Sequence, residues 1–148
     1  MNMRLLKKLS KIPCKVEKWF RRGYTEKIAE ALRMHGLLES FRYSYWALVP
    51  SPVLVEVSRF LPRCVYRERH KSRPTIGEFV ELAKEHGELY FAVNILTRER
   101  SSREDFFIDA VYIPVEEGEL VEWAKRYSPE DYGEVKVKGS PYMFFWWG

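Results

Sequence analysis

The chain is predicted to be an α+β protein built on a split βαβ core, with strands and helices in the order βαββαβ. Two segments with strand-like alternation, 89–97 and 105–113, flank a short basic loop and indicate a hairpin. Helix signals precede and follow this hairpin, and an aromatic segment ends the chain. With 148 residues, 46% of them hydrophobic, the chain is long enough for one domain with a packed core. We expect a basic helical extension over 1–40 and the α+β domain over 41–148.

The N-terminal segment 3–20 has the pattern of a basic amphipathic helix. Its apolar residues recur in steps of four and three, and its lysines lie largely off this stripe. The stripe comprises Leu5, Leu9, Ile12, Val16 and Trp19. Pro13 interrupts the hydrogen-bond ladder, which predicts a kink or two short helices. Such a helix packs on its own domain, lies on a membrane surface, grips phosphates or docks on a partner, and the pattern leaves these alternatives open.

Three further elements are expected before residue 63. Thr25 marks the start of a helix, and Gly36 marks its end. Residues 41–50, FRYSYWALVP, alternate as a strand. Residues 51–62 fit either a short helix with Ser51 as its cap or a β-branched strand, and both alternatives remain open.

The second half of the chain gives the core order. Residues 63–70, RCVYRERH, are predicted to form a strand. Thr75 and Glu78 match a capping box at the start of a helix that ends at Gly87. The remaining elements are strands at 89–97 and 105–113, a helix near 117–127, a short extra strand within 128–141 and a last strand at 141–147. The six main elements follow the order of ferredoxin-like and RRM-like folds.

The charge of the chain is unevenly distributed. Residues 1–73 hold 17 basic and 6 acidic side chains, a net charge of +11, whereas residues 74–148 hold 8 basic and 15 acidic side chains, a net charge of −7. The asymmetry indicates a basic face directed at an anionic partner, or two halves that neutralise each other within the fold. We weigh these two interpretations about evenly and favour the basic face, because Arg and Lys cluster at 63–73.

Composition excludes several classes of protein. The chain has no run of about 18 apolar residues and no uninterrupted apolar segment of a signal peptide near its start, so we expect a cytoplasmic protein without a membrane partner. Cys14 and Cys64 match no metal-binding or disulfide spacing, and two reduced thiols are predicted. The absence of Gln, with only two Asn and many charged residues, is typical of a hyperthermophile.

Asp109 is a lone carboxylate in the apolar segment FFIDAVYI. Alternation assigns Phe106, Ile108, Ala110 and Tyr112 to the helix-covered face, and Asp105, Phe107, Asp109, Val111 and Ile113 to the other face. A symmetric hairpin sets Asn94 opposite Asp109 and Arg98 opposite Asp105. We therefore expect Asp109 on an open sheet face beside an amide. An Asn–Asp hydrogen bond that only makes this face soluble is the alternative.

Cations and aromatic rings near this face form a candidate nucleic-acid-binding site. Its cations are Arg63, Arg67, Arg69, Lys71, Arg73, Arg98, Arg100 and Arg103, and its other members are Tyr66, Tyr90, Asn94 and Phe107. Cations bind phosphates and rings stack on bases, as single-stranded nucleic acid requires, whereas ion-pair networks of a thermophile are the alternative. In the last strand, Tyr142, Phe144 and Trp146 alternate with Met143, Phe145 and Trp147. One set is core, and the other is a stacking row or a patch for a protein partner.

Residues 63–148 resemble the archaeo-eukaryotic primase superfamily at three motifs. LYFAVN (89–94) matches a Y-F-x-V-N strand, FFIDAVYI (106–113) occupies the place of a D-x-D strand for two metal ions, and KGSPYMFFWW (138–147) falls where a glycine turn with a histidine is found. Phe107 and Val111 leave Asp109 as the single carboxylate, and Tyr142 or Met143 replaces the histidine. The resemblance therefore implies a degenerate, non-catalytic member, similar to the small accessory subunit of archaeal primases.

The leading hypothesis is a nucleic-acid-binding accessory protein. Its partners would be single-stranded or primer-template nucleic acid and, by the resemblance, a catalytic primase or other replication subunits. We expect no metal ion, no other cofactor and no catalytic residue, with Asp109 and Asn94 as a vestigial site.

Two hypotheses from other classes remain. A metal-dependent nucleotidyltransferase or nuclease would use the nearest carboxylates, which are Asp105, Asp109, Glu116 and Glu117. A protein-interaction module would use the C-terminal FFWW segment and the basic N-terminal helix.

Overall fold

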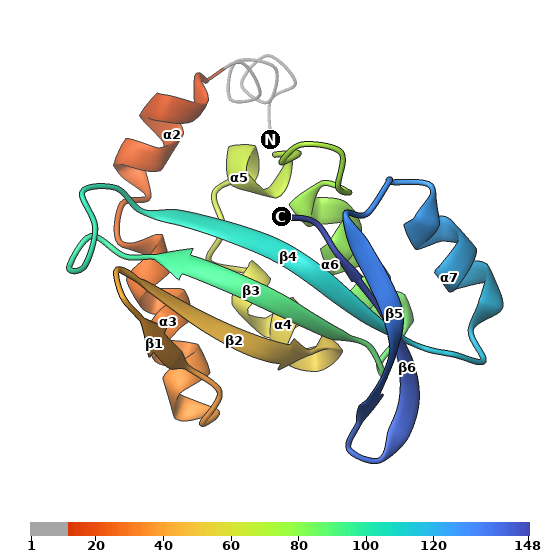
Figure 1. Ribbon diagram of the computed structural model, residues 1–148. Helices are drawn as coiled ribbons and strands as arrows, with labels where there is room; N and C mark the ends of the chain where they lie inside the picture. Colours follow the sequence, from red (N-terminus) through yellow and green to blue (C-terminus); the bar gives the residue numbers. More distant parts are fainter. Residues whose placement is uncertain (1–11) are drawn as a thin grey trace.

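A computed structural model describes residues 12–148, which form a six-stranded antiparallel sheet with helices α3, α4 and α6 on one face (Figure 1). The strands are β1 (Glu39–Phe41), β2 (Ser44–Pro50), β3 (Tyr90–Leu96), β4 (Asp105–Pro114), β5 (Asp131–Val137) and β6 (Ser140–Trp146). The helices are α2 (Cys14–Phe20), α3 (Tyr24–Met34), α4 (Ser51–Ser58), α5 (Arg63–Tyr66), α6 (Ile76–Glu85) and α7 (Gly118–Lys125). The predicted stripe residues Leu5 and Leu9 lie outside the described residues.

The α+β class is confirmed, but the observed strand order differs from that of a split βαβ core. The order across the sheet is β1-β2-β3-β4-β6-β5. In a split βαβ unit the first and second strands are separated by the third strand, which lies between them. Here β2 and β3 occupy the places of the first and second strands, and they pair directly with each other. The connection from β2 to β3 holds three helices, α4, α5 and α6, and returns the chain antiparallel to β2.

Most of the predicted elements are present near their expected bounds. The capping box of α6 is confirmed, since the Thr75 hydroxyl accepts the amide of Glu78 and the Glu78 carboxylate accepts the amide of Thr75, each at 3.0 Å. The segment 51–62, which fitted two alternatives, begins as helix α4 with Pro52 in its first turn. Pro13 is the N-cap of α2, so this helix begins directly after it, and the part of the predicted helix within residues 1–11 lies outside the described residues.

The strand predicted for RCVYRERH was wrong. Residues Arg63–Tyr66 form the short helix α5, and the following residues are irregular. Pro62 fixes the backbone at the start of the helix, and the Glu17 carboxylate accepts the amide of Cys64 at 3.1 Å. These contacts with α2 satisfy an orphan amide of a helix start, which the local sequence pattern does not reveal.

The core lies between the sheet and the helices. Strand β3 alternates strictly, and its buried residues Phe91, Val93 and Ile95 face the helices. Helix α3 contributes Ile28 and Leu32 to the same cluster, so this part of the segment before residue 40 packs on the domain. The other sheet face carries partly exposed side chains, and no helix of the described residues lies over it in Figure 1.

A β-bulge at Asp109 changes the register of the central hairpin. Val93 pairs with Ile108 and Ala92 pairs with Ala110, which leaves Asp109 as the extra residue. The bulge reverses the alternation of β4 beyond this point, so Val111 and Ile113 are buried in the core. The prediction that placed Val111 and Ile113 on the open face was therefore wrong, because it assumed an uninterrupted pleat.

Candidate nucleic-acid interface

A basic groove lies between α2 and the β3–β4 loop, residues 97–104. Its volume is about 660 Å³. The groove is lined by Lys15, Val16, Lys18, Trp19 and Arg22 from the α2 side and by Arg98, Ser102, Arg103 and Glu104 from the loop. We call this set the α2 groove. It brings cations from two segments about 80 residues apart in sequence onto one surface.

The electrostatics of the α2 groove favour an anionic ligand. Five of the nine lining residues are basic and one is acidic. Lys18 forms an ion pair with Glu68 at 3.0 Å, but Lys15, Arg98 and Arg103 form no ion pair with another described residue. The carboxylate of Glu104 is held by the start of α3. The groove therefore presents several uncompensated positive charges.

Glu104 caps helix α3 from a distant part of the chain. Its carboxylate accepts the amides of Gly23 at 2.8 Å and Thr25 at 3.1 Å and the Thr25 hydroxyl at 2.8 Å. These donors are the orphan groups of a helix start, where the helix dipole also favours negative charge. The Glu26 carboxylate in turn accepts the amide of Arg98 at 2.9 Å. Both ends of the β3–β4 loop are thus attached to the start of α3.

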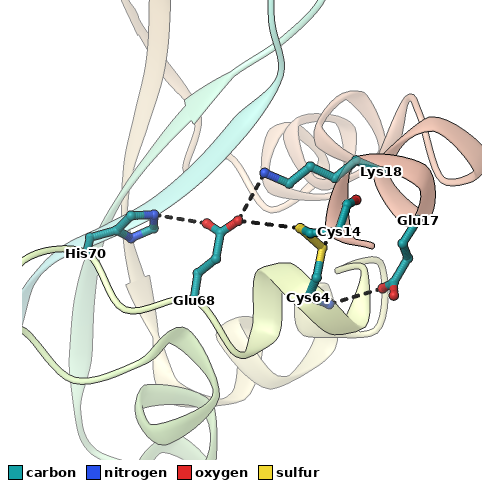
Figure 2. Close-up of a disulfide and its surroundings, with 6 residues drawn as sticks. All are labelled: Cys14, Glu17, Lys18, Cys64, Glu68 and His70. Carbon is teal, nitrogen blue, oxygen red and sulfur yellow. Dashed lines mark hydrogen bonds and ion pairs between the residues drawn. A yellow bond between two sulfur atoms is a disulfide. The ribbon is translucent and has the colours of Figure 1, made fainter. Parts of the chain in front are cut away.

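Helix α2 is attached to the domain by covalent and polar contacts, since it contains no buried residue. A disulfide joins Cys14 to Cys64 of α5, and the Glu17 and Lys18 side chains contact the same region (Figure 2). Arg21 adds a hydrogen bond to the carbonyl of Phe60 at 3.2 Å. The prediction of two reduced thiols was wrong, because the fold brings together two cysteines that are 50 positions apart.

Trp19 supplies an aromatic surface beside these cations. Its side chain is 61% exposed, and the guanidinium of Arg22 lies 4.3 Å from its ring centroid. A solvent-exposed tryptophan on a charged helix does not contribute to the core. A ring of this size next to several cations is a suitable platform for a nucleobase.

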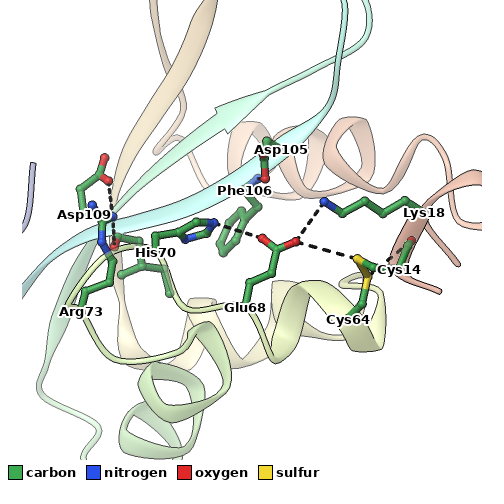
Figure 3. Close-up of polar contacts among 10 residues, drawn as sticks. Cys14, Lys18, Cys64, Glu68, His70, Arg73, Asp105, Phe106 and Asp109 are labelled. Carbon is green, nitrogen blue, oxygen red and sulfur yellow. Dashed lines mark hydrogen bonds and ion pairs between the residues drawn. A yellow bond between two sulfur atoms is a disulfide. The ribbon is translucent and has the colours of Figure 1, made fainter. Parts of the chain in front are cut away.

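Asp109 does not lie on an open face beside Asn94, and this prediction was wrong. Asn94 pairs with Phe107, and Leu96 instead of Arg98 pairs with Asp105. The carboxylate of Asp109 accepts a hydrogen bond from the Arg73 guanidinium at 2.7 Å (Figure 3). Arg73 is only 4% exposed and also donates to two backbone carbonyls. Arg73 therefore acts within the fold, and the phosphate contact expected for it is ruled out by burial.

The remaining predicted residues are spread over several surfaces. Arg69 pairs with Glu78 at 2.8 Å, and Lys71 lies 3.9 Å from Glu130. Arg63 and Arg67 are exposed at α5. Arg100 lies over the ring of Tyr45, with its guanidinium carbon Cζ 4.7 Å from the ring centroid. Tyr66 donates its hydroxyl to Glu81 at 2.7 Å and packs on Gly77. Of the twelve predicted binding residues, Arg98 and Arg103 are the two that join the α2 groove.

A second hollow, of about 560 Å³, lies on the open sheet face. Trp46, Leu48, Tyr90 and Tyr112 line it together with Lys136 and Lys138. Lys138 lies 5.7 Å from the ring centroid of Tyr90. Of these rings only Tyr90 was predicted, because Tyr112 reaches this face through the bulge and Trp46 belongs to an early strand. The alternation of FRYSYWALVP is the signal that identifies Trp46.

The structure of the last strand, β6, shows which of the two predicted aromatic sets belongs to the core. Phe145 and Trp147 are buried in the core, whereas Trp146 is 42% exposed. Phe144 pairs with Tyr112 and Gly133. Phe144 and Trp146 therefore lie on the open face, whereas Tyr142 of the same set is buried and donates its hydroxyl to the carbonyl of Glu88 at 2.8 Å.

The carboxylates proposed for a metal-dependent enzyme are not gathered at one place. Asp109 is bound by Arg73, and Glu116 and Glu117 follow Pro114 at the opposite end of β4 from Asp105. Two-metal phosphoryl transfer needs carboxylates that clamp both ions about 4 Å apart. The four residues do not provide this arrangement.

Comparisons of the chain with protein-family models, with curated proteins and with solved structures give no match. Within residues 12–148, every helix is too short or too polar to cross a membrane.

Proposed function

We propose that the protein binds single-stranded nucleic acid through the α2 groove. The observation that carries this proposal is the convergence of Lys15, Arg22, Arg98 and Arg103 around the exposed ring of Trp19. Charge for phosphates and a ring for bases are the two components of sequence-tolerant single-strand binding.

The groove suits a flexible strand better than a rigid duplex. Its cations come from a helix on one side and a loop on the other, so a strand that enters the groove is contacted from both sides. Trp19 stands among them and stacks on a base only when that base is unpaired. The open sheet face offers further rings, at Trp46, Tyr90 and Tyr112.

An accessory role in primer synthesis, which the primase resemblance implies, remains a prediction. The separation of Asp105, Asp109, Glu116 and Glu117 supports a binding role over two-metal catalysis at these residues. Strand binding through the α2 groove does not depend on the resemblance.

Fluorescence anisotropy with labelled single-stranded DNA and RNA oligonucleotides at increasing salt concentrations tests the proposal. The double variant Arg98→Ala/Arg103→Ala should weaken binding. If each arginine contacts one phosphate, the slope of log K against log salt should become shallower by about 1.4, since each contact to a single strand contributes about 0.7. Trp19→Ala should weaken binding by about 1–3 kcal/mol with little change of slope.

Lys125→Ala/Arg126→Ala is the matched control, because it removes two cations from α7, at the far end of the molecule from the β3–β4 loop (Figure 1). The proposal requires this control to bind like the wild type. Absence of binding at low salt, or an equal loss in the two double variants, would contradict it.

A further inference from the structure

Three potential metal ligands converge beside the α2 groove. Glu68 and His70 follow α5, and Asp105 is the first residue of β4. One ligand atom from each of these side chains lies within 4.8 Å of the other two. Figure 3 shows the three side chains between the disulfide and the Arg73–Asp109 pair.

The existing contacts leave donor atoms of this cluster available. The Glu68 carboxylate uses one oxygen for Lys18 at 3.0 Å and the other for His70 Nε2 at 3.1 Å. Among the residues described, the only donor to the Asp105 carboxylate is the neighbouring amide of Phe106, at 3.0 Å. His70 Nδ1 is buried and has no hydrogen-bond partner among the described residues. Its ring is oriented by Phe107, at a centroid distance of 4.6 Å.

The hydroxyl of Tyr24 provides a second, independent observation. Tyr24 is 2% exposed, and its hydroxyl has no hydrogen-bond partner among the described residues. Burial raises the pKa of Tyr24, and the nearby carboxylates of Asp105, Glu104 and Glu68 raise it further. The phenol is therefore a neutral donor next to these carboxylates. A buried donor without a partner costs free energy unless a water molecule or ligand accepts its hydrogen bond.

We propose that Glu68, His70 and Asp105 form a binding site for one divalent transition-metal ion, either Zn²⁺ or Mn²⁺. One imidazole nitrogen and two carboxylate oxygens suit these ions, whereas Mg²⁺ prefers oxygen ligands alone. Three protein ligands leave at least one position for water, and such a water would be an acceptor for the buried Tyr24 hydroxyl, which lacks a partner among the described residues. The inference departs from the expectation of a protein without metal, and it is independent of nucleic-acid binding.

Metal binding requires an adjustment of the side chains. Three ligand atoms at about 2.1 Å from a tetrahedral ion are about 3.4 Å apart, so side-chain rotations must bring atoms that are now up to 4.8 Å apart closer by up to about 1.4 Å. Lys18 can keep its contact with one oxygen of Glu68, while the metal takes the oxygen that now contacts His70. Both carboxylates balance the charge of the ion.

Isothermal titration of the metal-free full chain with ZnCl₂ and with MnCl₂ tests the site. We expect one ion per chain, and a loss of affinity of at least about tenfold in Asp105→Asn and in His70→Ala. His35→Ala is the matched control, because His35 also contacts a glutamate, Glu56, at 2.7 Å but belongs to no described three-ligand cluster. Absence of one-to-one binding in the wild type, or unchanged affinity in both ligand variants, overturns the proposal.

A measurement on the wild type keeps the test independent of whether the variants fold. Substoichiometric Mn²⁺ should broaden the amide NMR signals of Glu68, His70 and Asp105 before those of other residues. Broadening centred elsewhere, for example on His35 and Glu56, overturns the assignment of the site.

Discussion

Arg73 and Asp109 form a largely buried ion pair that joins three separate parts of the chain. The guanidinium donates to the Asp109 carboxylate at 2.7 Å and to the carbonyls of Ile108 and Trp147, each at 2.9 Å. Strand β6 pairs with β4 only from Ala110 to Pro114, so the first half of β4 has no strand on that side. Arg73 therefore satisfies backbone and side-chain acceptors where the sheet ladder stops.

Substitution of Arg73 should be strongly destabilising. Arg73→Ala leaves the Asp109 carboxylate and two carbonyls without their donor, and breaking a buried pair in this way costs about 3–5 kcal/mol. Urea unfolding followed by circular dichroism measures the change in the free energy of unfolding.

Arg69→Ala provides the comparison on the same segment. Arg69 pairs with Glu78 at 2.8 Å, but its side chain is 45% exposed, and pairs of this kind contribute about 0–1 kcal/mol. A similar loss of stability in the two variants would contradict the structural role assigned to Arg73.

The Cys14–Cys64 disulfide should contribute most of the attachment of α2. The two cysteines are 50 residues apart, and closing a loop of this length in the unfolded chain corresponds to about 4 kcal/mol in the chain-entropy description. The double variant Cys14→Ser/Cys64→Ser should therefore unfold at lower urea concentration. Because α2 has no buried residue, its amides should also exchange hydrogen faster than those of α3 in this variant.

Reduction of the wild type tests the same contact without a substitution. A reductant should lower the stability of the wild type to that of the serine variant and leave the variant unchanged. Equal stability of the oxidised and reduced wild type would show that the polar contacts of Glu17, Lys18 and Arg21 suffice to hold α2 in place.

The sequence predicted most elements, because their signals are local. The capping box of Thr75 and Glu78 and the alternation of β3 each lie within a few residues, and both are observed. The bulge at Asp109 has no such signal, since FFIDAVYI reads as one uninterrupted strand. The extra residue reversed the faces of Val111 and Tyr112. Asn94 lies on the loop side of the bulge, so its pairing with Phe107 instead of Asp109 comes from the register of the β3–β4 loop, which the sequence also does not reveal.

Two cations of the α2 groove, Arg98 and Arg103, were predicted as binding residues, but their location was not. Lys15 and Arg22, which were not predicted, reach the groove through α2. Their convergence depends on the Cys14–Cys64 disulfide and on the Glu104 contact with α3, both between residues at least 50 positions apart. Glu68, His70 and Asp105 likewise meet only in the fold. Spacing in the sequence carries no information about such contacts.

Glu104 should stabilise the start of α3 from the β3–β4 loop. Glu104→Ala removes the acceptor of the Gly23 and Thr25 amides, and loss of a helix cap costs about 1–2 kcal/mol. Hydrogen exchange at these two amides should accelerate together with the fall in stability. Glu99→Ala is the control in the same loop, because Glu99 accepts only the exposed hydroxyl of Tyr45, and it should leave both amides unaffected.

The stability contributed by Glu78 should disappear in acid. Burial alone would raise the pKa of Glu78, but hydrogen bonds from Tyr127 and Thr75 and the charge of Arg69 outweigh it, so the pKa lies below its usual value of 4.5. A carboxylate with a lowered pKa in the folded state stabilises the protein fully above its unfolded pKa and loses this contribution as the pH falls through the folded value. The difference in unfolding free energy between the wild type and Glu78→Gln should therefore be largest near neutral pH and shrink below about pH 4.5. Urea unfolding at a series of pH values measures this difference, and a difference that stays constant into acid would show that the ionised carboxylate contributes no more than the amide.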